Sequence, residues 1–360
     1  MPNSQGFHPS SERKARAVRA MGATQIAASF SRPEGSFRGT IAERDLLPHA
    51  PGVATNVSCP RGTVMTMTTG QQNPLPPPRS QDADLPDPRL ATLSPSRASD
   101  FKTCPQLYKF RSIDRIPTVP TVYQARGTTA HLALERLFSE PASQRTPERL
   151  YDLFREAWVE LKPEEFPDLF TSLDDERTWG IESLQLLSDY FRMEDPSSFE
   201  PDELEMDLTV EVGTMTIRGI LDRMERVTEV GADGAARELL VITDYKTGKA
   251  PPENYAQKAF FALKIYALLI RVTRGVTPDR LRLLYLNGPT EYTMDINDRQ
   301  LDAMQRQLEA LWSAIDQAIR TDVWPARTSA LCDWCDFKAD LCPAWNGTPI
   351  PRLAEDAPIV

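Results

Sequence analysis

The stretch Ile242-Thr243-Asp244-Tyr245-Lys246-Thr247-Gly248 decides the fold class that this sequence predicts. It continues the apolar run Leu239-Leu240-Val241-Ile242, so a buried strand is expected to end in an acid and a lysine. Residues i and i+2 of a strand point to the same face. Asp244 and Lys246 should therefore project together from the end of this strand.

The segments around this stretch are typical of a small antiparallel sheet. Runs rich in Val, Ile and Thr predict strands over 204–212, 215–227 and 238–245. Tight turns are expected at Gly213-Thr214 and over 231–234. The stretch Gly219-Ile220-Leu221-Asp222-Arg223 then places Asp222 on the strand beside Asp244, within reach of the same point.

Helical periodicity dominates on both sides of these strands. One helix is expected to begin at an N-cap Ser96 and to run through Phe110. Further helices are predicted over 127–138, 147–161, 173–193, 254–271 and 298–320, and a further strand over 281–286, paired with 291–294. This order of elements predicts an α/β fold in which helices flank a mixed sheet.

Two carboxylates and a lysine that converge at a strand end suit a hard divalent cation such as Mg²⁺ or Mn²⁺. Such a cation would acidify a water, polarise a phosphate and offset charge on the leaving oxygen. Lys246 would hold or deprotonate the attacking water, or neutralise charge on the phosphate. A solvated ion pair is the alternative for Asp244 and Lys246 alone, whereas the additional Asp222 favours a metal site.

The net charge of −10 argues against a protein that coats nucleic acid by bulk charge. Basic residues nevertheless outnumber acidic ones between positions 97 and 126. They are candidate contacts to a DNA backbone, with a solvated helix face as the alternative. The candidates are Arg97, Lys102, Lys109, Arg111 and Arg126.

The N-terminal residues contain no apolar stretch typical of a secretory signal. The longest apolar stretch, 259–270, is interrupted by Lys264 and is too short to span a bilayer. We expect a cytoplasmic protein without a membrane segment. Because the cytoplasm is reducing, clustered cysteines there bind metal or perform redox chemistry more often than they form disulfides.

These motifs, in this order, resemble the RecB-family nuclease domains, a branch of the PD-(D/E)xK superfamily, and especially its stand-alone exonucleases. The resemblance covers about residues 92–350 and implies a restriction-endonuclease-like core. The matching segments are Ser94-Pro95-Ser96-Arg97 through Cys104-Pro105, Gly127-Thr128-Thr129-Ala130-His131, Gly219-Ile220-Leu221-Asp222-Arg223, Asp244-Tyr245-Lys246-Thr247-Gly248, Tyr266-Ala267-Leu268 and the C-terminal cysteines.

The resemblance implies roles for single residues. Asp222 and Asp244 match the metal-binding acids, and Lys246 matches the catalytic lysine. His131 matches the helix histidine that completes the metal shell, and the carbonyl of Tyr245 is expected to face the same metal. Without the resemblance, a histidine at the start of an amphipathic helix is more often a cap or a surface group.

Tyr266 matches the catalytic-site tyrosine of the family's Q-x-x-x-Y motif, which contacts DNA or braces the site. The chain departs from the pattern at Ala262, where glutamine is usual. Glu135, one helical turn after the histidine, is a weaker candidate for the site, with a solvated helix acid as the alternative. Glu205 on the first strand is a weaker candidate still.

Cys332, Cys335 and Cys342 form a C-x2-C-x6-C pattern, and Cys104 lies far upstream. These cysteines suit one four-thiolate site, for which zinc is the general expectation. The resemblance to AddB-type and CRISPR-associated four-cysteine nucleases implies a [4Fe–4S] cluster instead, acting as a C-terminal iron–sulfur staple. Cys59 falls in a segment that we expect to be disordered.

Composition divides the chain. Residues 1–92 are Pro-rich in places and lack a sustained apolar period, which indicates a disordered extension. The resemblance then implies one nuclease domain and a short tail. Its parts are a helical part (93–200), a catalytic core (201–296), a long helix with the cysteine cluster (297–350), and the tail (351–360).

The sequence contains no G-x-x-x-x-G-K-[ST] phosphate loop, so it lacks a recognisable motor. The chain should act on single-stranded DNA or DNA ends, alone or with a helicase or repair partner. The first hypothesis is a metal-dependent DNA exonuclease in recombination or repair. The second is a non-catalytic DNA-binding or scaffold module that retains the fold and the cluster; the intact Asp222, Asp244 and Lys246 favour the first.

Overall fold

A mixed β-sheet carries the other elements of the structure, a computed structural model that describes residues 92–345. Its 5 strands pair in the order β1-β2-β3-β4-β5. β3 and β4 run parallel, and the other neighbours are antiparallel, as expected for a mixed α/β sheet. The strands are β1 (Glu203–Val212), β2 (Met215–Val230), β3 (Ala236–Lys249), β4 (Arg280–Asn287) and β5 (Thr290–Asp295).

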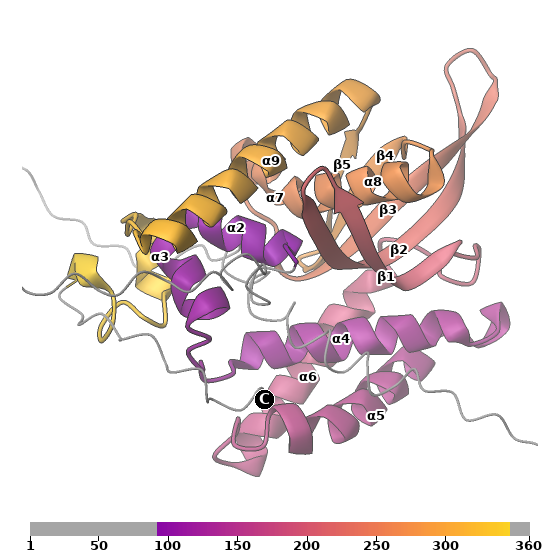
Figure 1. Ribbon diagram of the computed structural model, residues 1–360. Helices are drawn as coiled ribbons and strands as arrows, with labels where there is room; N and C mark the ends of the chain where they lie inside the picture. The colour runs from indigo at the N-terminus through magenta and orange to yellow at the C-terminus, as the bar shows by residue number, and fades with distance from the viewer. Residues whose placement is uncertain (1–91, 346–360) are drawn as a thin grey trace, which may run out of the picture. The chain divides into compact units, whose positions relative to one another are not determined.

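Helices cover both faces of this sheet (Figure 1). α8 packs on β1 to β4 and contacts α9 and α2, whereas α4 and α6 contact β3 and β4 and are joined by α5. The helices are α2 (Pro95–Thr103), α3 (Pro105–Tyr108), α4 (Val122–Ser139), α5 (Pro147–Glu165), α6 (Leu173–Tyr190), α7 (Glu253–Ala259), α8 (Phe261–Arg274) and α9 (Asp298–Thr321), with the short turns η3 (Lys109–Ile113), η4 (Ala142–Gln144), η5 (Ala330–Trp334) and η6 (Pro343–Trp345).

The alternation of side chains along β4 explains the two helical layers. Leu283 and Tyr285 belong to the apolar core that contains α8 and α9. Leu284 and Leu286 belong to a second core, with α4, α5 and α6. Successive residues of a strand face opposite sides, so an almost continuous apolar strand of this kind must be buried on both faces.

Four element boundaries differ from the sequence-based expectation. The helix expected to run from Ser96 through Phe110 ends at Thr103, and α3 begins at Pro105 after the extended Cys104. The N-cap of α2 is Ser94, not Ser96, because the Ser94 hydroxyl accepts the N–H of Arg97 at 3.1 Å. α4 begins at Val122, five residues before the expected start, behind a capping box formed by Thr121 and Gln124. The helix expected over 254–271 is divided at Phe260 into α7 and α8.

The other strands and helices agree with the expected ranges to within a few residues, including the hairpin at Gly213, whose φ is 61°. Among the described residues, no helix is long and apolar enough to cross a membrane. The expected disordered extension, including Cys59, and the expected tail at 351–360 lie outside the described residues, except for position 92.

Candidate metal centre

Acidic residues occupy one row across three neighbouring strands. β1 pairs with β2 on both sides of Glu205, and this register places Glu205 opposite Asp222. The pairing of β2 with β3 ends with Arg223 opposite Thr243, so the next position brings Asp222 opposite Asp244. Like charges directly opposite one another destabilise a sheet, and the regular ladder is interrupted at this row.

At this interruption, the Asp222 side chain accepts a backbone hydrogen bond in place of a regular one between the strands. The backbone N–H of Tyr245 donates to Asp222 Oδ2 at 3.0 Å, and His131 Nδ1 lies 3.4 Å from the same oxygen. On its other side, His131 Nε2 donates to the carbonyl of Tyr245 at 3.0 Å. The α4 helix is thereby joined to both β2 and β3 at the row of acids.

These contacts determine the protonation states of His131 and Asp222. Burial lowers the pKa of His131, but the carboxylates of Asp222, Glu205 and Asp244 outweigh it and raise this pKa to about 9. Burial raises the pKa of Asp222, but His131 and Lys246 hold it below its usual range. His131 is therefore an imidazolium at neutral pH, and a cation that binds its nitrogen must displace a proton.

Asp244 is 2% exposed, and neither of its carboxylate oxygens takes part in a hydrogen bond. The ammonium of Lys246 lies against Oδ2 as an ion pair. Burial raises the pKa of Asp244 to about 6, with Lys246 opposing this shift and Asp222 adding to it. A buried carboxylate is normally satisfied by hydrogen bonds, so these oxygens are suited to bind a cation.

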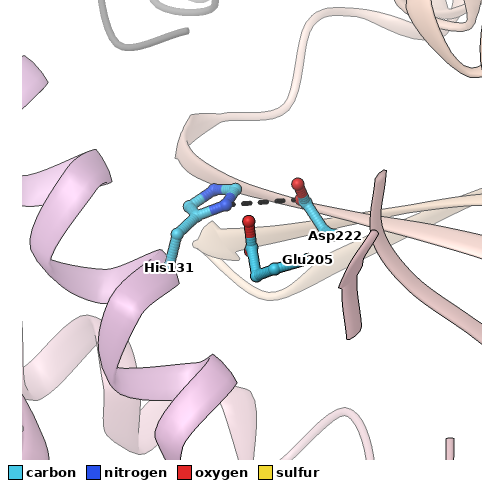
Figure 2. A group of neighbouring side chains, drawn as sticks. All are labelled: His131, Glu205 and Asp222. Carbon is cyan, nitrogen blue, oxygen red and sulfur yellow. Dashed lines mark ion pairs between the residues drawn. The ribbon is translucent and has the colours of Figure 1, made fainter. Parts of the chain in front are cut away.

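Within residues 92–345, the group of side chains best placed to share a metal ion is His131, Glu205 and Asp222, whose ligand atoms lie within 4.8 Å of one another. Figure 2 shows these side chains converging from α4, β1 and β2. Nitrogen and carboxylate ligands of this kind fit a divalent cation. Glu205 was the weakest sequence-based candidate, whereas Asp244 lies beside the group and not within it.

Tyr266 is buried against this row. Its ring packs against Gly219, where an added Cβ would lie 2.6 Å from Tyr266 Cε1. Burial raises the pKa of Tyr266 well above its usual value, and Asp222, Asp244 and Glu205 raise it further, so its hydroxyl stays protonated. This position opposite the acids fits the expected role of Tyr266 in bracing the site.

Four cysteines from distant parts of the chain line one pocket. Cys104 lies between α2 and α3, and Cys332, Cys335 and Cys342 come from the segment after α9. The backbone N–H of Arg327 donates to Cys104 Sγ at 3.4 Å. None of the four forms a disulfide. The full set of cysteines predicted for one site therefore lines this pocket as free thiols.

Most of the basic residues predicted to contact DNA have partners inside the protein. These partners favour a structural role for the residues concerned. Arg97 donates to Tyr108 Oη at 3.1 Å, Lys109 pairs with Asp114 at 2.6 Å, Arg111 pairs with Asp100 at 3.1 Å, and the buried Arg126 pairs with Glu182 at 2.8 Å.

Lys102 differs from this set. Its ammonium lies 4.1 Å from the ring centre of Phe261. Burial lowers the pKa of Lys102, and the neighbouring Lys264 and Lys258 lower it further. These residues form a lysine cluster (Lys102, Lys258 and Lys264) that lies on α2, α7 and α8.

Residues 92–343 match the family described as the PD-(D/E)XK nuclease superfamily. Among solved structures, the chain is similar to a protein from Eubacterium rectale that is provisionally described as an exonuclease, at 14% identity and a TM-score of 0.45, covering 78% of this chain and 97% of that chain. It is also similar to the protein SSO0001, at 14% identity and a TM-score of 0.31, covering 73% and 89%. Both likenesses are too distant to indicate a function, and the comparison with curated proteins finds no match.

Proposed function

The chain belongs to the PD-(D/E)XK nuclease superfamily, and on that premise we propose that it is a metal-dependent deoxyribonuclease of the RecB-like branch. Its reaction is the hydrolysis of phosphodiester bonds in single-stranded DNA or at DNA ends, in recombination or repair. The observation that supports this best is the buried Asp244 carboxylate, which lies next to Asp222, forms an ion pair with Lys246 and takes part in no further hydrogen bond.

The residues divide the chemistry among them. His131, Asp222 and Asp244, with the carbonyl of Tyr245, would hold Mg²⁺ or Mn²⁺. The cation would polarise the scissile phosphate and make a water more acidic. Water attacks phosphorus and releases a proton, the bond between phosphorus and the leaving sugar oxygen breaks, and that oxygen takes up a proton.

Lys246 places a positive charge at the end of β3, where it offsets the negative charge that develops on the phosphate. Its ion pair with Asp244 holds the ammonium in this position. Tyr266 closes the site from the side of α8, and its buried ring keeps bulk water away from the acids. Both residues act through geometry that is present before any substrate binds.

Cleavage of end-labelled single-stranded DNA in Mn²⁺ tests the proposal. Wild type should degrade it, whereas Asp244→Ala and Lys246→Ala should lose at least about 100-fold in rate, the scale for removal of one electrostatic group from an active site. Asp207→Asn, an exposed β1 carboxylate paired with Arg218 at 2.9 Å, is the matched control and should retain full activity. Equal degradation by wild type and both alanine variants would mean that the site lies elsewhere.

A non-catalytic DNA-binding or scaffold module is the second candidate function. It would explain the fold and the cysteine pocket, but it gives no reason to bury Asp244 without a hydrogen bond. Labels at the 5′ and 3′ ends in the same assay distinguish an exonuclease from an endonuclease. A wild-type protein that binds DNA without cleaving it under any divalent cation would support the scaffold.

The cysteine pocket is proposed to hold a [4Fe–4S] cluster that ties α2 and α3 to the segment after α9. The four thiols line one pocket although they come from two distant segments of the chain, which supports a shared site. Zinc is the alternative metal for four thiolates. A brown anaerobic preparation with broad visible absorption is expected; a colourless protein with stoichiometric zinc contradicts it.

The cellular setting is part of the proposal. A cytoplasmic location and a helicase or repair partner would suit a nuclease whose sequence has no recognisable motor motif. Affinity purification of the tagged protein from its own cells, with and without DNA-damaging treatment, tests for such a partner. Recovery of the protein alone under both conditions would favour independent action on DNA ends.

A further inference from the structure

Glu205 has an unusual backbone for a residue inside a strand. Its φ is 43°, in the left-handed region that favours glycine. The other described non-glycine residues with positive φ are Arg115 and Asp322, which follow the ends of η3 and α9. Glu205 instead has paired residues on both sides in β1, so its conformation interrupts an otherwise regular ladder.

A left-handed glutamate costs free energy that glycine would avoid. Such outliers persist where the surrounding structure imposes them, and they concentrate at functional sites. Here the outlier lies opposite Asp222, and its carboxylate comes within 4.8 Å of the ligand atoms of Asp222 and His131 (Figure 2). The chain therefore adopts an unfavourable backbone and brings two carboxylates together at the same place.

A second observation makes this row more than a cluster of acids. Asp244 occupies the next position of the row, is 2% exposed, and is held by the ion pair with Lys246, with no further hydrogen bond to either oxygen. Lys246 and His131 supply positive charge, but they face three carboxylates at one interruption of the sheet. A divalent cation is the chemical species that would balance this set.

We propose that Glu205 is a metal ligand, and that the left-handed turn of β1 exists to present its carboxylate to the cation held by Asp222 and His131. The inference rests on the proposed function, which needs a divalent cation at this row, and it adds a third strand to the site. In the absence of the cation, the left-handed backbone and the repulsion between facing carboxylates are costs that Lys246 and His131 offset only in part.

Mn²⁺ binding to the full-length protein tests the role of Glu205 without an activity measurement. Free Mn²⁺ is followed by electron paramagnetic resonance as protein is added, for wild type, Glu205→Gln and Glu205→Gly. Glu211→Gln is the matched control, because it removes one exposed carboxylate from the same strand, beside Thr216 and away from the row. Thermal melting in EDTA checks that each variant is folded.

Both Glu205 variants should bind Mn²⁺ at least about 10-fold more weakly than wild type, since even an outer-sphere partner of a metal is typically worth that much. Mn²⁺ should also raise their melting temperature less than it raises that of wild type. Glu211→Gln should match wild type in both measurements. Glu205→Gly should melt above Glu205→Gln in EDTA, because it relieves the left-handed backbone.

Wild-type affinity in Glu205→Gln would overturn the inference and leave the proposed function intact, since the cation would still bind. Absence of Mn²⁺ binding by wild type itself would overturn the proposed function and the inference together. If Glu205→Gln does not fold, the Mn²⁺ affinity of Glu205→Gly is the test. Wild-type affinity in this variant overturns the inference.

Discussion

Asp244 shows at the scale of one residue how the site is built at the expense of stability. Its carboxylate is buried, takes part in no hydrogen bond and faces Asp222 across an interrupted ladder. Lys246 compensates part of this cost through an ion pair. Such a loss of stability is a recurrent cost where function needs a strained or destabilised site.

We predict that Asp244→Asn stabilises the metal-free protein while it abolishes cleavage. The amide removes one of two facing charges at neutral pH, where burial opposes ionisation of Asp244, and the gain should be about 1–2 kcal/mol. Urea denaturation in EDTA measures this gain. The exposed Asp207→Asn should change stability by less than about 0.5 kcal/mol, and a less stable Asp244→Asn would contradict the prediction.

Gly219→Ala should destabilise the protein by about 1–3 kcal/mol, because the new methyl group would meet the Tyr266 ring at 2.6 Å and Pro95 Cδ at 3.2 Å. The displaced ring should also reduce cleavage. Gly180→Ala is the matched control: it lies inside α6 with no atom within 4 Å of the added Cβ, and it should stabilise by about 0.5–1 kcal/mol. Calorimetric unfolding compares the two; equal effects would mean that Gly219 does not position Tyr266.

Single residues of the candidate site differ in how much of their position in the fold the sequence could predict. Asp222, Asp244 and Lys246 follow from strand alternation and from one hairpin, both local patterns. The position of Glu205 depends on one left-handed residue and on the register of β1, which no local pattern reports. The partners of Arg126 could not be predicted either, because a sequence shows a charged residue without showing which side chains surround it.

At the scale of elements, a buried polar network joins the sheet to the segment after α6. Arg223 is fully buried and donates to Glu225 at 2.8 Å and to Glu194 at 2.9 Å. Arg282 on β4 donates to Glu225 at 2.7 Å and to Glu194 at 3.0 Å. Because Arg223 follows Asp222 in β2, the network fixes the strand from which the acid projects.

Arg223→Met should cost about 3–5 kcal/mol, since it leaves two buried carboxylates to Arg282 alone. The matched control is Arg226→Met on the same strand, whose exposed side chain pairs with Asp202 and Glu238 at the surface. The control should cost no more than about 1 kcal/mol. Urea denaturation measures both, and similar losses would show that the buried network adds nothing specific.

Elements with a strong apolar period were predicted well, and their ends less well. The strands and α9 carry uninterrupted patterns, so their ranges agree with the structure. Two serines separated by one proline both suited an N-cap, and only the hydrogen bond to Arg97 distinguishes Ser94 from Ser96. The division at Phe260 follows from tertiary packing, since Phe260 is buried in the α8 core.

For the whole molecule, DNA binding must overcome a net charge of −10. The lysine cluster concentrates positive charge, because Lys258 and Lys264 lie close enough to Lys102 to lower its pKa. Repulsion between its members would be relieved by a polyanion. We therefore expect the cluster to contribute more to DNA binding than the internally paired basic residues.

Changing Lys102, Lys258 and Lys264 together to Gln should reduce the salt dependence of single-stranded DNA binding by about 2 in the log–log slope. Lys109→Gln, which removes a lysine paired with Asp114, should leave the slope unchanged. Fluorescence anisotropy at several salt concentrations, in EDTA to prevent cleavage, measures both. A larger change of the slope in Lys109→Gln than in the triple variant would contradict this prediction and would favour Lys109 as the DNA contact.

The interrupted row of acids also has an evolutionary consequence. Neutral residues at Glu205, Asp222 and Asp244 would let the ladder close and would remove a standing cost to folding. A lineage released from selection for catalysis should therefore drift toward such residues while it keeps its fold. Inactive descendants of this protein would be recognised by an uninterrupted sheet at this row and by a higher melting temperature than their active ancestors.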